Sequence, residues 1–159
     1  MEKDLGNYRK SYEKGSLLEH SINKDPFDLF QLWFNEVDTH FQETEINAVT
    51  LSTIGNDGFP KSRVVLLKKF NSAGFVFYTN YESEKAKALS NSPKCCLSFH
   101  WQSAERQVII KGVADKIDPL QSDAYFLSRP KGSQLGAWAS KQSTVIDNRA
   151  VLDTQLESL

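Results

Sequence analysis

Hydrophobic side chains recur at helical spacing in the segment that follows Asp25 and Pro26. The repeating positions are Phe27, Phe30, Trp33, Phe34, Val37 and Phe41. Asp25 is a good helix cap and Pro26 suits a first helical turn, so the pattern predicts an amphipathic helix with an aromatic face. Residues 1–24 are polar and weakly patterned. We therefore expect a flexible arm over residues 1–24 and a folded domain over residues 25–159.

From Ala48 onward the hydrophobic period changes to two, which is the spacing of β-strands. The expected strands cover residues 49–54, 61–70, 75–79, 94–101 and 106–117. The turn residues Asn56, Asp57 and Gly58 join the first two strands as a hairpin. Five short strands with few crossover helices favour an antiparallel barrel or sandwich over a parallel sheet.

Short helices are expected between and after the strands. They cover residues 84–89, a segment that begins at Pro119, residues 134–140 and a segment from residue 147 onward. Ser83 and Asp118 are placed to cap the first two of these helices. Pro130 should end the second helix near Arg129, because proline disfavours helical backbone at the residue before it.

The composition is that of one ordinary globular domain. The chain has 159 residues, and 19 basic against 20 acidic side chains give a net charge of −1. We therefore expect no nucleic-acid partner. We also expect no membrane association, because no apolar stretch approaches the roughly 20 residues of a membrane span. The start lacks the apolar centre of a signal peptide, and the adjacent Cys95 and Cys96 are typical of small core residues, so the sequence predicts a cytoplasmic protein.

Several classes of chemistry have no motif in the sequence. The glycines form neither a dinucleotide-binding nor a Walker fingerprint. The three histidines, His20, His40 and His100, lie far apart, and ordinary surface or core roles explain them better than metal ligation or base catalysis. We expect no metal site and no nucleophilic catalysis.

Basic and hydroxyl side chains gather near the ends of the second and third strands. Arg63 and Lys68 flank an apolar run, and a regular pleat sends them to opposite faces, so a site shared by both requires a bulge. Tyr78 and Thr79 precede Ser83 and Lys85 at a helix start, where backbone N–H groups and the helix dipole favour an anion. A capped helix with a solvated Lys85 explains the same residues.

A second candidate anion site lies in the helix that begins at Pro119. Tyr125 and Arg129 are four residues apart and so share a helical face, with Ser133 just beyond Pro130. These groups could hold a phosphate. On these residues alone, the favoured interpretation of Arg129 is a cation that complements the helix C-terminus.

Six sequence segments together resemble the pyridoxamine 5'-phosphate oxidase family: RVVLLK, FYTN, SEK, ERQVIIKG, YFLSRPKGSQLGAW and SKQS. The resemblance runs in order from about Tyr8 to the end of the chain. It implies a mainly β fold with flanking helices (α+β), an antiparallel Greek-key split β-barrel. It further implies a homodimer that binds flavin mononucleotide (FMN) between its two subunits.

The resemblance also assigns roles to residues of this chain. The implied FMN ligands are Arg63, Val64, Val65, Leu66, Leu67, Lys68, Tyr78, Thr79, Lys85, Gln107, Gln142 and Ser143. We add Ser83 to this set because it lies at the start of the helix that carries Lys85. The implied ligands of the substrate phosphate are Lys68, Tyr125, Arg129 and Ser133. Arg9 and Tyr12 match an arm that closes over the pyridoxal site.

The implied reaction is oxidation of pyridoxamine or pyridoxine 5'-phosphate to pyridoxal 5'-phosphate, with oxygen reduced to hydrogen peroxide. The flavin supplies the chemistry, so no catalytic side chain is assigned. The chain departs from the family at two places: Glu84 stands where an arginine is usual beside the flavin phosphate, and the sequence stops at Leu159 before the family's final strands. A fragment of a longer protein and a shortened relative that binds FMN or pyridoxal phosphate with little turnover both remain alternatives, and a flavin reductase on the same barrel is a third.

Overall fold

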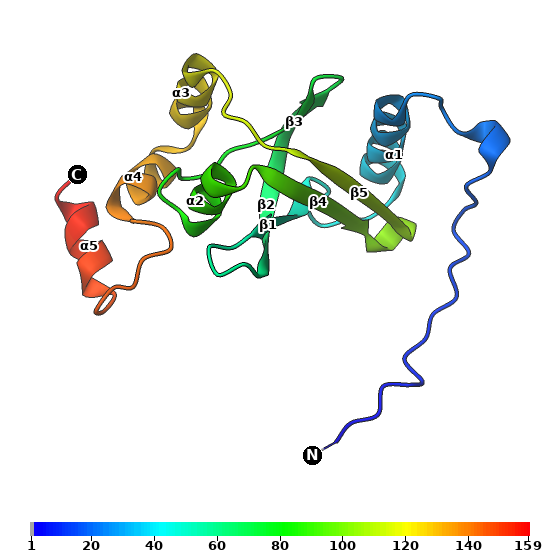
Figure 1. Cartoon of the computed structure of the whole chain (residues 1–159), viewed down its shortest axis with the longest axis horizontal. Helices are drawn as coiled ribbons and strands as arrows, with labels where there is room; N and C mark the ends of the chain where they lie inside the picture. The colour runs from blue at the N-terminus through cyan, green and yellow to red at the C-terminus, as the bar shows by residue number, and fades with distance from the viewer. Residues whose placement is uncertain (1) are drawn as a thin grey trace.

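The computed structural model describes residues 2–159 and is built around a five-stranded antiparallel sheet (Figure 1). The strands are β1 (Ala48–Ile54), β2 (Pro60–Asn71), β3 (Gly74–Phe77), β4 (Lys94–Trp101) and β5 (Arg106–Val113). The helices are α1 (Pro26–His40), α2 (Glu84–Asn91), α3 (Pro119–Ser128), α4 (Lys131–Ala139) and α5 (Ala150–Glu157). Two short 3₁₀ turns, η1 (Glu19–Ser21) and η2 (Gln102–Ala104), complete the described elements.

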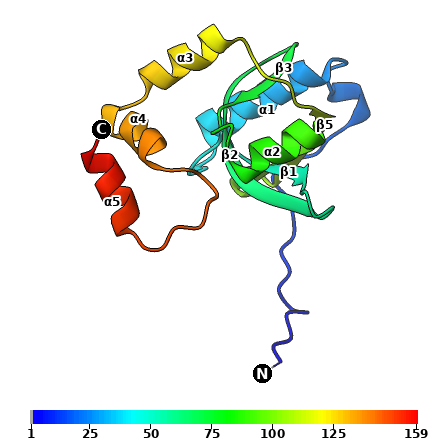
Figure 2. The ribbon, with the colours of Figure 1, turned by 60° about the vertical axis from the view of Figure 1, so that its left-hand side comes forward.

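The strand order β3-β2-β1-β4-β5 is a Greek key. The first three strands follow one another as a meander, and the chain then crosses through α2 and returns as β4 on the other side of β1. This is the arrangement in which a fourth strand comes back to lie beside the first. Figure 2 shows β2 strongly bent, so that the sheet curls instead of lying flat. The predicted antiparallel Greek key is therefore confirmed.

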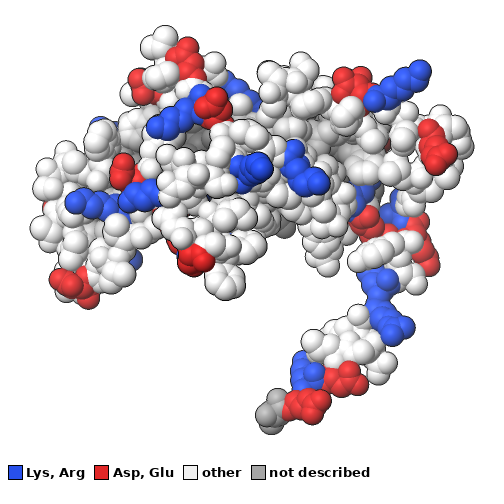
Figure 3. All heavy atoms as spheres, in the orientation of Figure 1, with Lys and Arg blue, Asp and Glu red and all other residues white. Residues whose placement is uncertain are grey.

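The parts of the chain outside the sheet lie at its two ends. The N-terminal segment runs away from the body beyond α1, while α3, α4 and α5 form a lobe on the other side of the sheet (Figures 1 and 2). Within these three helices only Ala139 is buried. The space-filling view shows basic and acidic side chains scattered among neutral ones on the visible face (Figure 3). Among residues 2–159 no helix combines the length and the apolar character that a membrane crossing needs.

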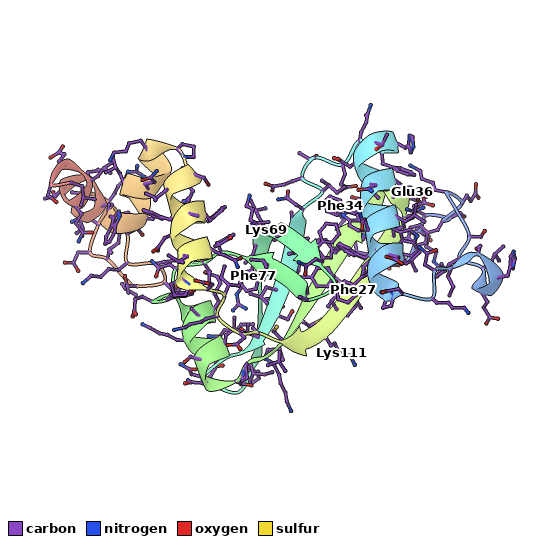
Figure 4. All side chains as sticks on the ribbon, turned by 90° about the horizontal axis from the view of Figure 1, so that it is seen from above. Phe27, Phe34, Glu36, Lys69, Phe77 and Lys111 are labelled. Atoms are coloured by element: carbon purple, nitrogen blue, oxygen red, sulfur yellow. The ribbon has the colours of Figure 1, made fainter. Side chains whose placement is uncertain are left out.

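The core lies between α1 and the inner face of the sheet. The helix begins as predicted, because the Asp25 carboxylate accepts a hydrogen bond of 2.8 Å from the Phe27 N–H. Phe30 packs against Phe99 and Trp101, with ring centroids 5.2 and 5.8 Å away. Figure 4 shows Phe27 and Phe34 directed from α1 toward the sheet. The aromatic face predicted from the helical period is thus the face that α1 buries.

Two strands end earlier than the sequence pattern predicts. The strand expected to reach Thr79 ends at Phe77, because Leu67 pairs with Phe77 while Tyr78 leaves the sheet. The last expected strand ends at Val113, which pairs with Lys94; Pro93 precedes Lys94 and has no N–H to extend the ladder. The final helix begins at Ala150 instead of at residue 147. The division of the chain into residues 1–24 and 25–159 stays a prediction.

Candidate functional site

The Arg63 side chain lies on the inner face of β2 and donates hydrogen bonds to groups of β1 and β2. Its Nη1 donates to the Thr53 hydroxyl and to the Lys61 carbonyl at 2.8 Å, and to the Leu51 carbonyl at 3.2 Å. Arg63 lies on the inner face with Val65 and Leu67, as the period of two requires. Since all three bonds use one nitrogen, the other guanidinium N–H groups are left to bind an additional acceptor.

Lys85 lies in the first turn of α2, close to Arg63. Ser83 caps this helix as predicted: its fully buried hydroxyl accepts a hydrogen bond from the Ala86 N–H. The pKa of Lys85 is lowered, first because burial removes water from the ammonium group and second because the Arg63 charge repels it. Two cations at a helix start, with no carboxylate paired to either in the described residues, favour an anion.

A loop distant in sequence reaches the same place. Lys85 Nζ donates to Gln142 Oε1 at 3.1 Å across 57 positions of the chain. Ser143, the next residue, has a φ of 66°, a left-handed conformation that is uncommon for residues other than glycine. The structure thus brings Arg63, Lys85 and Gln142 together, and Ser143 follows Gln142 in the chain. We call Arg63, Lys85 and Gln142 the cationic cluster.

Glu84 is paired with a residue outside the cationic cluster. Its carboxylate pairs with Lys61 Nζ, which also lies 3.4 Å from Asp57. The hydrogen bond and charge of Lys61 lower the pKa of Glu84, so the carboxylate stays ionised and paired. The unusual residue beside the predicted flavin phosphate is therefore partly offset by a cation on β2.

Tyr78 and Tyr125 connect the sheet to the C-terminal lobe. Their rings stack with centroids 3.7 Å apart and an angle of 7° between the planes. The hydroxyl of Tyr78 is buried and has no hydrogen-bond partner among residues 2–159. A buried hydroxyl without a partner is costly, so this atom is a candidate for contact with a bound polar group.

Arg129 and Ser133 are arranged differently from the sequence expectation. Arg129 caps the C-terminus of α3 with extended backbone, φ −73° and ψ 150°, because Pro130 follows it. It therefore leaves the helical face of Tyr125, and its guanidinium lies 5.9 Å from the centre of the Phe126 ring. Ser133 is exposed in the first turn of α4.

Lys68 occupies the bulge that a shared site requires. Leu67 pairs with Phe77 and Lys69 with Val76, so Lys68 is the extra residue on β2. It is exposed and lines a surface hollow of about 590 Å³ together with Phe34 and Asn47. No hydrogen bond or ion pair among the described residues joins Lys68 to the side chains of α3 and α4.

Other predicted site residues lie apart from the cationic cluster. Val64 is 66% exposed on the outer face of the sheet, and Leu67 is buried in the core. Thr79 and Leu66 are half-buried. Gln107 alternates with the core residues Val108 and Ile110 on β5, which places it on the outer face as well. Arg9 and Tyr12 lie on the N-terminal segment, where Arg9 donates hydrogen bonds to the carbonyls of its neighbours Gly6 and Asn7.

The sequence analysis missed two residues of this site. Thr53 is the buried polar residue on the inner face of β1 that accepts a bond from Arg63. Its alternation with Val49 and Leu51 carried the signal, because a threonine in a buried strand position needs a hydrogen-bond partner. Lys61 pairs with Glu84, a contact between β2 and α2 for which the sequence offers no local signal.

Known proteins resemble this chain along most of its length. A sequence model of the family described as pyridoxamine 5'-phosphate oxidase matches residues 23–159. A pyridoxine/pyridoxamine 5'-phosphate oxidase from Flavobacterium johnsoniae is 61% identical over 156 residues, which cover 98% of this chain and 73% of the relative. Oxidases of the same name from Flavobacterium psychrophilum and Christiangramia forsetii are 58% and 54% identical, covering 99% and 100% of this chain and 73% and 74% of theirs.

Solved structures share the fold. PhzG from Burkholderia lata, in complex with tetrahydrophenazine-1-carboxylic acid, aligns with a TM-score of 0.82 at 23% identity over 90% of this chain and 71% of its own. A pyridoxamine 5'-phosphate oxidase-related, FMN-binding protein from Nostoc punctiforme aligns with a TM-score of 0.62 at 14% identity, covering 83% and 73%. The predicted split barrel is thus confirmed as the fold. Because the family model covers residues 23–159 and relatives of one name match nearly the whole chain, the chain belongs to the pyridoxamine 5'-phosphate oxidase family of enzymes.

Proposed function

We propose that this chain binds FMN and oxidises pyridoxamine or pyridoxine 5'-phosphate to pyridoxal 5'-phosphate, with oxygen reduced to hydrogen peroxide. The names of relatives 54–61% identical to it support the reaction. The observation that carries the proposal is the cationic cluster, in which Arg63 and Lys85 meet at a capped helix start without a carboxylate paired to either.

The residues of the site fit FMN. A phosphate ester carries close to two negative charges at neutral pH, and an anion between Arg63 and Lys85 would offset the repulsion between these two cations, which is one cause of the lowered pKa of Lys85. The buried Tyr78 hydroxyl needs a polar partner that the described residues do not provide. Thr79, Ser143 and the backbone of residues 64–67 complete the proposed flavin contacts. When bound, the flavin supplies a two-electron acceptor that oxygen regenerates.

We propose that Lys68, Tyr125, Arg129 and Ser133 bind the phosphate of the substrate. Arg129 and Lys68 contribute charge, and the two hydroxyl groups add hydrogen bonds that fix its orientation. Neither Arg129 nor Lys68 has a carboxylate partner in the described residues, so both charges are free for a ligand. The work of these side chains is to place the substrate's reacting carbon and to exclude water, which is positioning rather than acid–base chemistry.

A second copy of the chain is part of this proposal. The outer face of the sheet is mostly uncharged at its centre, where Ser52, Ser62, Val64, Cys96, Ser98 and Ile109 lie, and Lys111 is the cation that pairs with Cys96 on this face. Gln107 lies on that face, opposite Arg63, so one chain alone does not bring both side chains to a single flavin. A mostly uncharged face of this kind can be buried in a homodimer, which supports a site assembled from two copies.

The free thiols of Cys95 and Cys96 suit a reducing compartment, and we propose the cytoplasm. The mixed charges on the face in Figure 3 fit a small-molecule enzyme better than a nucleic-acid binder.

The test is spectroscopic and kinetic. The purified protein should show flavin absorbance, or acquire it with added FMN, and should consume oxygen and release peroxide with pyridoxine 5'-phosphate but not with pyridoxine. Arg129→Ala should raise KM for the phosphorylated substrate by roughly tenfold or more, the effect of losing a charge-assisted hydrogen bond, while flavin uptake stays unchanged. A colourless protein that takes up no FMN would overturn the proposal, and flavin uptake without peroxide would indicate a binding protein instead.

A further inference from the structure

Glu105 is an acidic residue in an unusual setting. It follows η2 at the turn between β4 and β5 and has left-handed backbone, φ 56° and ψ 37°. Such a conformation at a residue other than glycine persists only where the surroundings hold it. Although the residue lies at a hairpin end, its side chain is only 5% exposed. A carboxylate so covered requires hydrogen-bond donors.

The donors come from the N-terminal segment, about 90 positions away in sequence. The N–H groups of Glu13 and Lys14 donate to Glu105 Oε2 at 2.7 and 3.0 Å. Lys10 Nζ lies 2.9 Å from Oε1, so both carboxylate oxygens are engaged. Lys14 Nζ also donates to the Ser103 carbonyl at 2.6 Å. These contacts together are the arm anchor.

The turn that carries Glu105 is held to the body of the protein by hydrogen bonds. Glu43 accepts hydrogen bonds from both the N–H and the hydroxyl of Ser103, which ties η2 to the segment before β1. On the other side of the anchor the segment has only local contacts: Gly6 bonds Asp4, and Arg9 bonds Gly6. Tyr12 is 75% exposed. Figure 1 shows this stretch extending away from the body. The described segment is therefore held at one point.

We propose that Glu105 anchors the N-terminal arm and is the positioning residue that presents Arg9 and Tyr12 to the substrate held by a second copy of the chain, because the lobe of α3, α4 and α5 lies at the other end of its own sheet. The carboxylate fixes the backbone at residues 13 and 14, directly after Tyr12, so that the arm loses less conformational entropy when it closes. The anchoring itself follows from the contacts of Glu105, and its link to substrate rests on the proposed function of Arg9 and Tyr12.

Trypsin tests the anchoring without any ligand. Lys10 and Lys14 are both trypsin sites inside the arm anchor, whereas Lys3 lies outside it and serves as an internal reference. Glu105→Gln keeps the shape but removes the charge, and cleavage after Lys10 and Lys14 should accelerate roughly tenfold, the effect of losing a charge-assisted hydrogen bond on local opening. Cleavage after Lys3 should not change. Glu82→Gln, at an exposed carboxylate, should behave as the unaltered chain.

A second variant guards against a general effect of altering the hairpin. Lys10→Met removes the ion pair from the arm side alone, and cleavage after Lys14 should again accelerate. Unchanged cleavage in both variants would overturn the anchor, whatever the enzyme's activity.

The positioning role is tested on the full chain loaded with FMN. Glu105→Gln should raise KM for pyridoxine 5'-phosphate several-fold while kcat and flavin affinity stay near their original values. Where turnover is absent, titration with pyridoxal 5'-phosphate, followed by its absorbance, measures the same weakening. Faster trypsin cleavage with unchanged KM and unchanged pyridoxal phosphate binding would refute the positioning role and leave a merely structural anchor. A protein that binds neither flavin nor pyridoxal phosphate, with the trypsin result intact, would refute the proposed function instead.

Discussion

Charge pairing around the cationic cluster is decided by individual side chains. Lys61 engages both Glu84 and Asp57, so one cation offsets part of the charge of two carboxylates near Arg63 and Lys85. The ion pairs are partly exposed and therefore weak. Because solvent screens these exposed charges, Glu84 lowers the positive potential at the cluster only modestly, which is compatible with flavin binding by this chain.

Glu84→Arg should tighten FMN binding several-fold. The substitution replaces a paired carboxylate with a third cation beside the phosphate, and exposed charges of this kind change affinities by only about 1 kcal/mol. Titration of the apoprotein, followed by quenching of flavin fluorescence, measures the change. Glu82→Arg makes the same change of charge two residues away and should have a smaller effect. Unchanged or weaker binding in Glu84→Arg would contradict the placement of Glu84 next to the flavin phosphate.

Attachment of the arm should depend on pH in a predictable direction. The hydrogen bond from Lys10 and those from the backbone of Lys14 and Glu13 lower the pKa of Glu105 from 4.5 to about 2. The anchored form therefore binds fewer protons than the free arm, so anchoring is complete above about pH 4.5 and is lost as the pH falls toward 2. Glu105 raises the pKa of Lys10, which therefore keeps its charge over this range, and Lys14 and Glu43 are the other charged residues that contact this turn, both through Ser103.

The amide resonances of Glu13 and Lys14 report this titration directly. In the unaltered chain they should shift with an apparent pKa near 2. In Glu105→Gln this shift should disappear, because the carboxyl that accepts both N–H bonds is gone. An apparent pKa near 4.5 in the unaltered chain would mean that the carboxylate is solvated and the arm unattached.

Among the elements, α1 contributes most of the aromatic packing. Phe30 packs against five other aromatic rings: Phe34, Phe70, Phe75, Phe99 and Trp101. Phe30→Ala should lower the free energy of unfolding by about 3–5 kcal/mol, the range for removing a buried phenylalanine side chain. Urea denaturation followed by tryptophan fluorescence measures it. Leu32→Ala, on the exposed side of the same helix, should cost far less; equal losses would mean that α1 does not pack through the face of Phe30.

Local patterns predicted most elements, because their signals lie within a few residues of each boundary. Asp25, Ser83 and Asp118 each cap the helix expected of them. The ends of β3 and β5 were predicted too far along the chain, since strand ends depend on pairing partners that alternation does not reveal. The bulge at Lys68 illustrates this limit of prediction. A site shared by Arg63 and Lys68 requires a bulge in the strand, but the position of the bulge follows from the pairing of β2 with β3.

At the scale of the whole molecule, the candidate site was only partly predictable. The meeting of Arg63, Lys85 and Gln142 followed from a family resemblance, because contacts across 57 positions leave no local pattern. The pairing of Lys61 with Glu84 and the anchoring of the arm by Glu105 had no such signal and were found only in the structure. Gln107 remains on the opposite face from Arg63 within one chain, and the homodimer is the proposed reason.

A substitution that disrupts the outer face of the sheet should therefore separate the subunits and, at the same time, weaken flavin binding. Ile109 is 60% exposed at the centre of β5 on that face, and arginine there would bury an unpaired charge in the proposed interface, which is strongly unfavourable. The unaltered protein should sediment as a dimer, and Ile109→Arg should sediment as a monomer that retains less FMN at equal concentration.

Leu32→Arg is the matched control, because it adds the same charge on α1, away from this face, and should leave the dimer intact. Circular dichroism of both variants should match that of the unaltered chain, since neither position belongs to the core. A dimer that survives Ile109→Arg would place the interface elsewhere. A monomeric Ile109→Arg that still holds FMN at full affinity would mean that one chain completes the site, so that Gln107 takes no part in it.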